Sequence, residues 1–212
     1  MKSLNINKEI KLLKPHYPIG IGKKVEELFK LGQLTEGKFS EKFEKKLSKY
    51  LNNDNCVLVN SGTSALTLAY RLLNLKNKDE VITTPFTCMA TNEPLYNDKI
   101  KFKFCDIDPK TGNASIESIK KLINKNTKAI VVVHWGGLPV DIPKLKKIIN
   151  PKKIKIIEDA AHALGAKINK KKIGNHGDYI CFSFQAIKHI TSGDGGLLVC
   201  KKKSDAKKAK LL

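Results

Sequence analysis

The segment Asn60-Ser61-Gly62-Thr63-Ser64 combines residue types that suit an anionic ligand. It follows a short apolar run and leads into a helical pattern, so we expect a turn between a strand and a helix N-terminus. Backbone amides and the helix dipole attract an anion there. Gly62 permits close approach, and Thr63 and Ser64 add hydroxyl donors. The segment predicts a phosphate site, with an ordinary Ser/Thr helix cap as the alternative.

A pair of acids, Glu158 and Asp159, directly follows the apolar run at 154–157, and two alanines and His162 come next. A carboxylate at the mouth of an apolar strand costs free energy unless a cation pairs with it. A protonated pyridine nitrogen is one such cation, and the alanines leave room for a ligand to pack closely. A helix-capping Asp or a surface pair of acids is the alternative.

Lys188 differs from most lysines of the chain in its surroundings. An apolar strand pattern ends near Ser183, and Ala186 and Ile187 directly precede the lysine. A lysine in partly apolar surroundings loses its proton more readily and becomes a nucleophile. A solvated surface lysine is the alternative for any lysine taken alone.

Apolar runs alternate with amphipathic stretches from residue 56 onward, which predicts an α/β fold with a mostly parallel, doubly wound sheet. Strands are expected at 56–59, 81–84, 101–107, 129–134, 154–157, 179–184 and 196–200. Helices are expected at 25–31, 40–51, 64–73, 115–123 and 141–149, with the start of another at 207–212. Because ligands bind at the carboxyl ends of such strands, the three segments should converge on one site.

The chain divides, by this pattern, into an N-terminal helical segment at 1–50 and a ligand-binding domain at 51–212. The start of the last helix so close to residue 212 suggests a truncated chain. A phosphate site, a strand-end carboxylate and a nucleophilic lysine are together what pyridoxal 5′-phosphate (PLP) needs.

The order and context of these segments resemble the DegT/DnrJ/EryC1/StrS family of PLP-dependent aminotransferases that act on nucleotide-linked keto sugars. The resemblance covers nearly the whole chain, and its most specific segments are the acid-Ala-Ala-His and Ser-Phe-x-x-x-Lys motifs. The matching segments are Leu34–Gly37, Phe43-Glu44, Ser61–Leu66, Pro85–Thr87, Ala90-Thr91, His134–Gly137, Pro139, Asp141, Glu158–His162, Ser183-Phe184, Lys188 and Gly193–Gly196.

The resemblance implies a role for each matched residue. Lys188 is the expected catalytic residue, carrying the cofactor as an internal aldimine, and Asp159 pairs with the pyridine nitrogen. His162 packs against the ring. Gly62, Thr63, Ser64 and Ser183 bind the phosphate. The family usually places an aromatic residue over the ring where this chain has Cys88, so the cysteine sulfur or Trp135 would have to replace that contact.

The resemblance also implies the aspartate-aminotransferase fold (PLP fold type I), with a small C-terminal domain that this chain lacks and a homodimer. The expected reaction is transfer of an amino group from glutamate to a nucleotide-linked keto-deoxysugar, in polysaccharide or glycan precursor synthesis. Two alternatives stay open: a PLP-dependent sugar dehydratase, in which a histidine replaces the lysine, and a non-catalytic fragment that binds nucleotides or polyanions. Because His189 directly follows Lys188 in the sequence, the dehydratase alternative needs a test.

Composition and charge limit the kinds of ligand and partner that we expect. The net charge is +20, but Arg71 is the only arginine, so we expect a solvated lysine surface and no specific nucleic-acid site. The five cysteines are odd in number and, like the five histidines, lack metal-ligand spacing, which predicts free thiols and no metal. No apolar stretch approaches a membrane span and no secretory signal begins the chain, so we expect a cytoplasmic protein.

Overall fold

The computed structural model describes residues 14–15, 18–32, 35–150 and 152–212. Parts of the helical segment expected at 1–50, namely residues 1–13, 16–17 and 33–34, lie outside the described residues, and so does Leu34 of the matching segment Leu34–Gly37. Within the described residues, helix α1 (Ile21–Leu31) precedes α2 (Lys38–Leu51). The domain boundary expected after residue 50 falls within α2, so the division of the chain stays a prediction.

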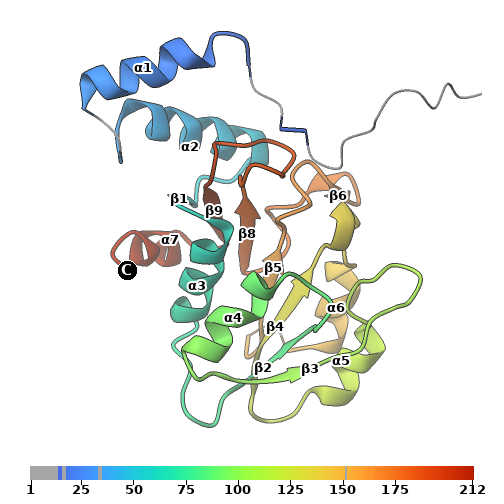
Figure 1. Cartoon of the computed structure of the whole chain (residues 1–212). Helices are drawn as coiled ribbons and strands as arrows, with labels where there is room; N and C mark the ends of the chain where they lie inside the picture. Colours follow the sequence, from blue (N-terminus) through green and yellow to red (C-terminus); the bar gives the residue numbers. More distant parts are fainter. Residues whose placement is uncertain (1–13, 16–17, 33–34, 151) are drawn as a thin grey trace, which may run out of the picture.

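A seven-stranded sheet forms the centre of the structure (Figure 1). Its strands are β1 (Cys56–Val59), β2 (Glu80–Thr83), β3 (Lys101–Phe104), β4 (Thr127–Val133), β5 (Lys155–Asp159), β8 (Tyr179–Ser183) and β9 (Gly196–Cys200). Their spatial order is β1-β9-β8-β5-β4-β2-β3. Neighbours from β8 to β3 pair in parallel, and β9 alone is antiparallel to both of its neighbours. The predicted mostly parallel sheet is confirmed.

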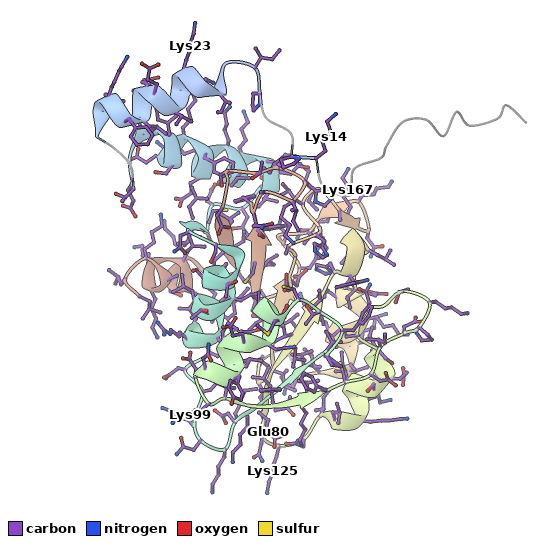
Figure 2. The ribbon with its side chains drawn as sticks, in the orientation of Figure 1. Lys14, Lys23, Glu80, Lys99, Lys125 and Lys167 are labelled. Atoms are coloured by element: carbon purple, nitrogen blue, oxygen red, sulfur yellow. The ribbon has the colours of Figure 1, made fainter. Side chains whose placement is uncertain are left out.

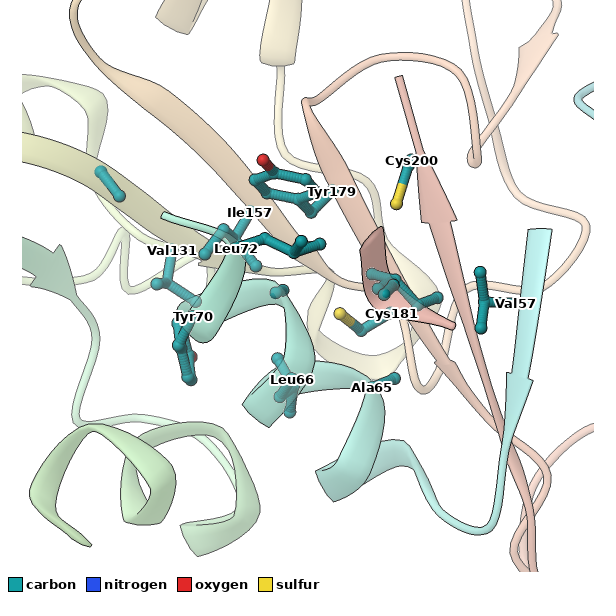
Figure 3. Packing of buried hydrophobic residues seen from close by; sticks show 14 of the residues in the cluster. Val57, Ala65, Leu66, Tyr70, Leu72, Val131, Ile157, Tyr179, Cys181 and Cys200 are labelled. Atoms are coloured by element: carbon teal, nitrogen blue, oxygen red, sulfur yellow. The ribbon is translucent and has the colours of Figure 1, made fainter. Parts of the chain in front are cut away.

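Helices cover both faces of the sheet, because alternate residues of each buried strand point to opposite faces. On one face, Val131 and Ile157 pack with α3 (Gly62–Leu72), α4 (Met89–Asn97) and α7 (Lys203–Ala209). On the other face, Ile130 and Ile156 pack with α5 (Ile116–Leu122) and α6 (Ile142–Ile148). Leu47 and Leu51 of α2 extend this second layer over β8 and β9. Figure 3 shows the first of these clusters, with α3 packed against the strands.

Six elements differ from the sequence-based expectation. Helix α4 was not expected, because Pro94 inside it removes a backbone donor. The last helix, α7, begins at Lys203 and ends at Ala209, so the expectation of a helix starting at 207 is wrong. Strand β3 ends at Phe104 rather than 107. The short hairpin of β6 (Lys167–Ile168) and β7 (Lys171–Lys172) and the 3₁₀ turn η1 (Trp135–Gly137) were also not expected.

The five lysines labelled in Figure 2 do not gather at one place. The labelled Lys14, Lys23 and Lys167 lie at one end, and Lys99 and Lys125 lie at the opposite end. This distribution agrees with a solvated basic surface. In the part of the chain that the structure describes, no helix combines the length and the apolar character needed to cross a bilayer.

Candidate active site

The carboxyl ends of the parallel strands and the start of α3 enclose a cavity of about 320 Å³. Seven of the residues predicted to act on the cofactor line it: Gly62, Thr63, Cys88, Asp159, His162, Ser183 and Lys188. Ser64 does not line it, because its hydroxyl hydrogen-bonds within the turn, to Asn60 Oδ1 at 2.6 Å and to Ser61 Oγ at 3.0 Å. The geometry therefore gives no support to Ser64 as a cofactor-binding residue.

Helix α3 begins at the cavity with Ser61 as its cap. The Ser61 side chain accepts a hydrogen bond from the Ser64 amide at 3.0 Å. The segment therefore contains the Ser/Thr helix cap that was the alternative to a phosphate site, and it also lies at the cavity. Gly62 fits closely, since a Cβ there would lie 2.9 Å from Ser183 Cβ. Gly196 is tighter still, because a Cβ would lie 2.2 Å from the Ser61 carbonyl oxygen. These two glycines bring the first turn of α3 against the ends of β8 and β9.

The amides of Gly62 and Thr63 are the first donors of α3. Among the described residues, neither has a hydrogen-bond acceptor. Free amides at a helix N-terminus carry partial positive charge, and the Ser183 hydroxyl lies beside them. This corner of the cavity can therefore bind an anion such as a phosphate.

Asp159 ends β5 and is only 6% exposed. Its Oδ2 accepts the Thr91 hydroxyl at 2.6 Å, and its Oδ1 accepts the Ala161 amide at 3.1 Å. No lysine, arginine or histidine of the described chain lies within salt-bridge distance of it. A buried carboxylate is costly without a cation, so the geometry suits a positively charged group of a ligand.

Lys188 lies on the loop between β8 and β9 and lines the same cavity. The base of the loop is closed by two hydrogen bonds, from the Phe184 amide to the Gly195 oxygen at 2.8 Å and from the Ser192 amide to the Phe184 oxygen at 3.0 Å. The Phe184 ring is buried and packs edge-on against Phe43 of α2, with centroids 5.1 Å apart. The loop is thus tied to the core, while Lys188 itself stays half-buried at the cavity wall. His189 is exposed and does not line the cavity.

His162 presents its ring to the cavity and is supported from behind. Trp135 packs edge-on against it with centroids 5.8 Å apart, and Phe86 packs on Trp135 at 4.6 Å. Burial lowers the pKa of His162, the nearby positive charge of Lys188 lowers it further, and Asp159 opposes both effects. The neutral imidazole is therefore favoured. Trp135 is not among the residues that line the cavity, and its contact with the cavity wall is through His162.

Cys88 is exposed at the mouth of the cavity, directly before α4. The other four cysteines are buried. Burial raises the pKa of the Cys56 thiol to about 12, of Cys105 to about 11 and of Cys200 to about 12. Their thiolate forms are scarce at neutral pH, so the expectation of inert buried thiols holds for these residues. Among the described residues no group of three or more metal-ligating side chains comes together.

Two threonines are the main functional candidates that sequence reasoning did not assign. Thr87 lines the cavity, and Thr91, one helical turn further along, is completely buried. Their hydroxyls lie 2.7 Å apart, and Thr91 continues the contact to Asp159. Both lie in segments that match the family, Pro85–Thr87 and Ala90-Thr91, and their spacing of four residues was the other available signal.

Comparison with known proteins bears on this site. A sequence model of the DegT/DnrJ/EryC1/StrS aminotransferase family matches residues 20–212. The UDP-4-amino-4,6-dideoxy-N-acetyl-beta-L-altrosamine transaminase of Helicobacter pylori is 36% identical over 191 residues, which are 89% of this chain and 51% of that protein. The chain spans about half the length of the curated relatives it matches.

Solved structures agree with the sequence matches. AtS13 from Actinomadura melliaura superposes with a TM-score of 0.91 at 39% identity, over 95% of this chain and 56% of that one. The PLP-form of Spr1654 from Streptococcus pneumoniae superposes with a TM-score of 0.90 at 25% identity, over 97% of this chain and 58% of that one. The likeness extends over the whole sheet and both helical layers.

Proposed function

The chain belongs to the DegT/DnrJ/EryC1/StrS aminotransferase family, and from that premise we propose that its cavity binds PLP and that Lys188 is the residue to which the cofactor attaches. We further propose that the protein transfers an amino group from glutamate to a nucleotide-linked keto-deoxysugar. The family is PLP-dependent, and a relative has been solved in its PLP-form. The nucleotide-sugar substrate is proposed by analogy with relatives such as the UDP-amino-sugar transaminase.

The residues of the cavity fit the charged groups of PLP. The buried Asp159 carboxylate lacks a cation in the described chain, and a protonated pyridine nitrogen supplies one. The free amides of Gly62 and Thr63, with the Ser183 hydroxyl, suit the phosphate. Lys188 lines the same cavity. A cation site and an anion site at one cavity, with an amine beside them, support PLP over a simple polyanion.

Each residue then has a separate task. PLP, when bound, supplies an electron sink for the substrate carbon. Asp159 would pair with the protonated pyridine nitrogen, and the neutral His162 would pack against the ring. Lys188 would hold the cofactor through Nζ and, once the substrate has displaced it, would act there as the base that moves a proton. The first turn of α3 would bind the phosphate.

The observation that carries the proposal is the buried, cation-free Asp159 in the same cavity as Lys188. We would add PLP to the purified chain, record the visible spectrum and treat the complex with borohydride. A long-wavelength band that borohydride traps on the peptide containing Lys188 supports the assignment. Lys188→Ala should lose the band, while Lys99→Ala, at the far end of the molecule, should keep it. A band that survives in Lys188→Ala contradicts the assignment.

Two alternatives make different predictions. A sugar dehydratase of this family needs a histidine in place of the lysine, and the exposed His189 is away from the cavity lining, which favours amino transfer. A non-catalytic nucleotide- or polyanion-binding fragment would bind phosphate compounds without a borohydride-stable product at Lys188. We also propose that residues 51–212 correspond to the PLP-binding large domain and that the active protein is a homodimer.

A further inference from the structure

Asp159 is connected to the cavity wall by a chain of two threonine hydroxyls. Thr91 Oγ1 donates to Asp159 Oδ2 at 2.6 Å, and Thr87 Oγ1 lies 2.7 Å from Thr91 Oγ1. Thr91 is completely buried, whereas Thr87 lines the cavity. Asp159 therefore lines the cavity itself and is also linked, through hydrogen bonds, to Thr87 at the cavity wall.

The direction of the hydrogen bonds follows from counting protons. A carboxylate only accepts, and a hydroxyl has one hydrogen. Because the Thr91 hydrogen is directed to Asp159, Thr91 Oγ1 must accept from Thr87. The single hydroxyl hydrogen of Thr87 is then donated to Thr91 Oγ1. The chain runs from Thr87 through Thr91 to Asp159 as long as the acid is ionised.

The backbone around Thr91 is held in place independently of Asp159. The Tyr70 hydroxyl of α3 donates to the Thr91 carbonyl oxygen at 2.7 Å. Asn92 donates to the Thr84 oxygen at 2.9 Å and accepts from the Thr83 hydroxyl at 2.7 Å, which anchors the start of α4 to the end of β2. Thr91 thus lies on a rigid support, and its hydroxyl is aimed at Asp159 before any ligand arrives.

We propose that Thr91 and Thr87 are positioning residues that orient the Asp159 carboxylate toward the cation of the bound ligand. The inference rests on the proposed function, because the cation that pairs with Asp159 is there the pyridine nitrogen of PLP. A donor to a charged acceptor stabilises more than one to a neutral acceptor, so the contribution of Thr91 should depend on the charge at position 159.

The test is a double-mutant cycle in PLP affinity, measured by absorbance titration. Thr91→Val keeps the side-chain shape and should weaken PLP binding about tenfold, while Thr91→Ser should stay within about threefold of the parent. In an Asp159→Asn background, Thr91→Val should cost about threefold or less. Thr87→Val should cost about fivefold. The matched control is Thr67→Val, whose hydroxyl bonds only the Thr63 oxygen and should leave the affinity unchanged.

Equal losses in the parent and in the Asp159→Asn background would mean that Thr91 contributes packing alone, and the proposal would be wrong. The same cycle is to be measured as shifts in melting temperature without PLP. There, Thr91→Val should lower the melting temperature more in the parent than in Asp159→Asn. If the parent binds no PLP, the proposed function fails, yet the melting cycle still confirms or overturns the coupling of Thr91 to Asp159.

Discussion

The His134 ring donates from Nε2 to Glu158 Oε2 at 2.8 Å, with both side chains completely buried. The Val140 amide donates to Nδ1 of the same ring at 3.0 Å, so Nδ1 carries no hydrogen and the imidazole is neutral. Glu158 also accepts from the Gly177 amide. The contact is a charge-assisted hydrogen bond that joins the ends of β4 and β5, one residue before Asp159.

Removing this histidine should destabilise the fold. In His134→Leu the buried Glu158 carboxylate loses a donor, and the free energy of unfolding should fall by about 3 kcal/mol or more. Glu158→Gln should also destabilise, because its single amide oxygen can accept from the ring or from the Gly177 amide but not from both. Urea denaturation measures both changes. Unchanged stability in either variant would contradict the role of this contact in joining β4 and β5.

Cys88 should be the one cysteine that reacts quickly in the native chain. It is exposed at the cavity, whereas the four others are buried and the pKa values of their thiols are raised. A maleimide should therefore label one site natively and all five cysteines after denaturation. Bound PLP should slow the native labelling, and Cys88→Ser should remove it. Labelling at an unchanged rate with PLP bound would place the cofactor away from Cys88.

Trp135 is the only tryptophan, and it packs against His162 at the cavity wall. Its fluorescence should therefore change when PLP binds, which gives a signal independent of absorbance. Trp135→Phe should lose the signal while still binding the cofactor. Binding seen by absorbance without a change in tryptophan emission would contradict the contact between Trp135 and the cavity wall.

Gly196 should not tolerate a side chain. A Cβ there would lie 2.2 Å from a backbone oxygen, so Gly196→Ala must move β9 away from the start of α3 and should cost about 3 kcal/mol or more. Gly22→Ala is the matched control, because nothing lies within 4 Å of that position in α1. It should raise stability by about 0.5–1 kcal/mol. Similar melting temperatures for the two variants would show that β9 can move away from the start of α3 at little cost in stability.

His162 should make stability depend on pH in a predictable direction. Its pKa in the folded chain is lowered from the ordinary value of 6.5, mainly by burial. The unfolded chain then binds more protons in acid, so this contribution is present above about pH 6.5 and is lost as the pH falls through the folded pKa. The melting temperature of the parent should fall relative to His162→Gln between about pH 8 and about pH 5.5. A constant difference would contradict the lowered pKa.

The sequence allowed prediction of the sheet and of most of the cavity because both depend on local patterns. Apolar runs mark the buried strands, and Gly62, Asp159 and Lys188 each follow or precede a run that ends at the same edge. Helix α4 was missed because Pro94 contradicts the local pattern, and only packing on the sheet compensates for it.

Other features depend on contacts between distant segments, which a single sequence does not reveal. Thr91 and Asp159 are 68 residues apart, and nothing near either one marks the pair. Ser64 illustrates the opposite difficulty, since its residue type suits an anion while its hydroxyl hydrogen-bonds within the turn; its cofactor-binding role stays a prediction. Cys88 or Trp135 was expected to replace the aromatic contact over the ring; Cys88 lines the cavity and Trp135 packs on His162, and which of them does so stays a prediction.

The loop that carries Lys188 leaves and re-enters the sheet at one point, where Phe184 and Gly195 are hydrogen-bonded. The β8–β9 pairing ends at Ser183 and Gly196, outside this loop, so the exposed or half-buried residues 185–190 take no part in it. Residues that line the cavity and residues that hold the sheet are therefore largely different residues here. Side chains at the cavity wall can vary in evolution with less effect on the sheet than changes within β8 or β9.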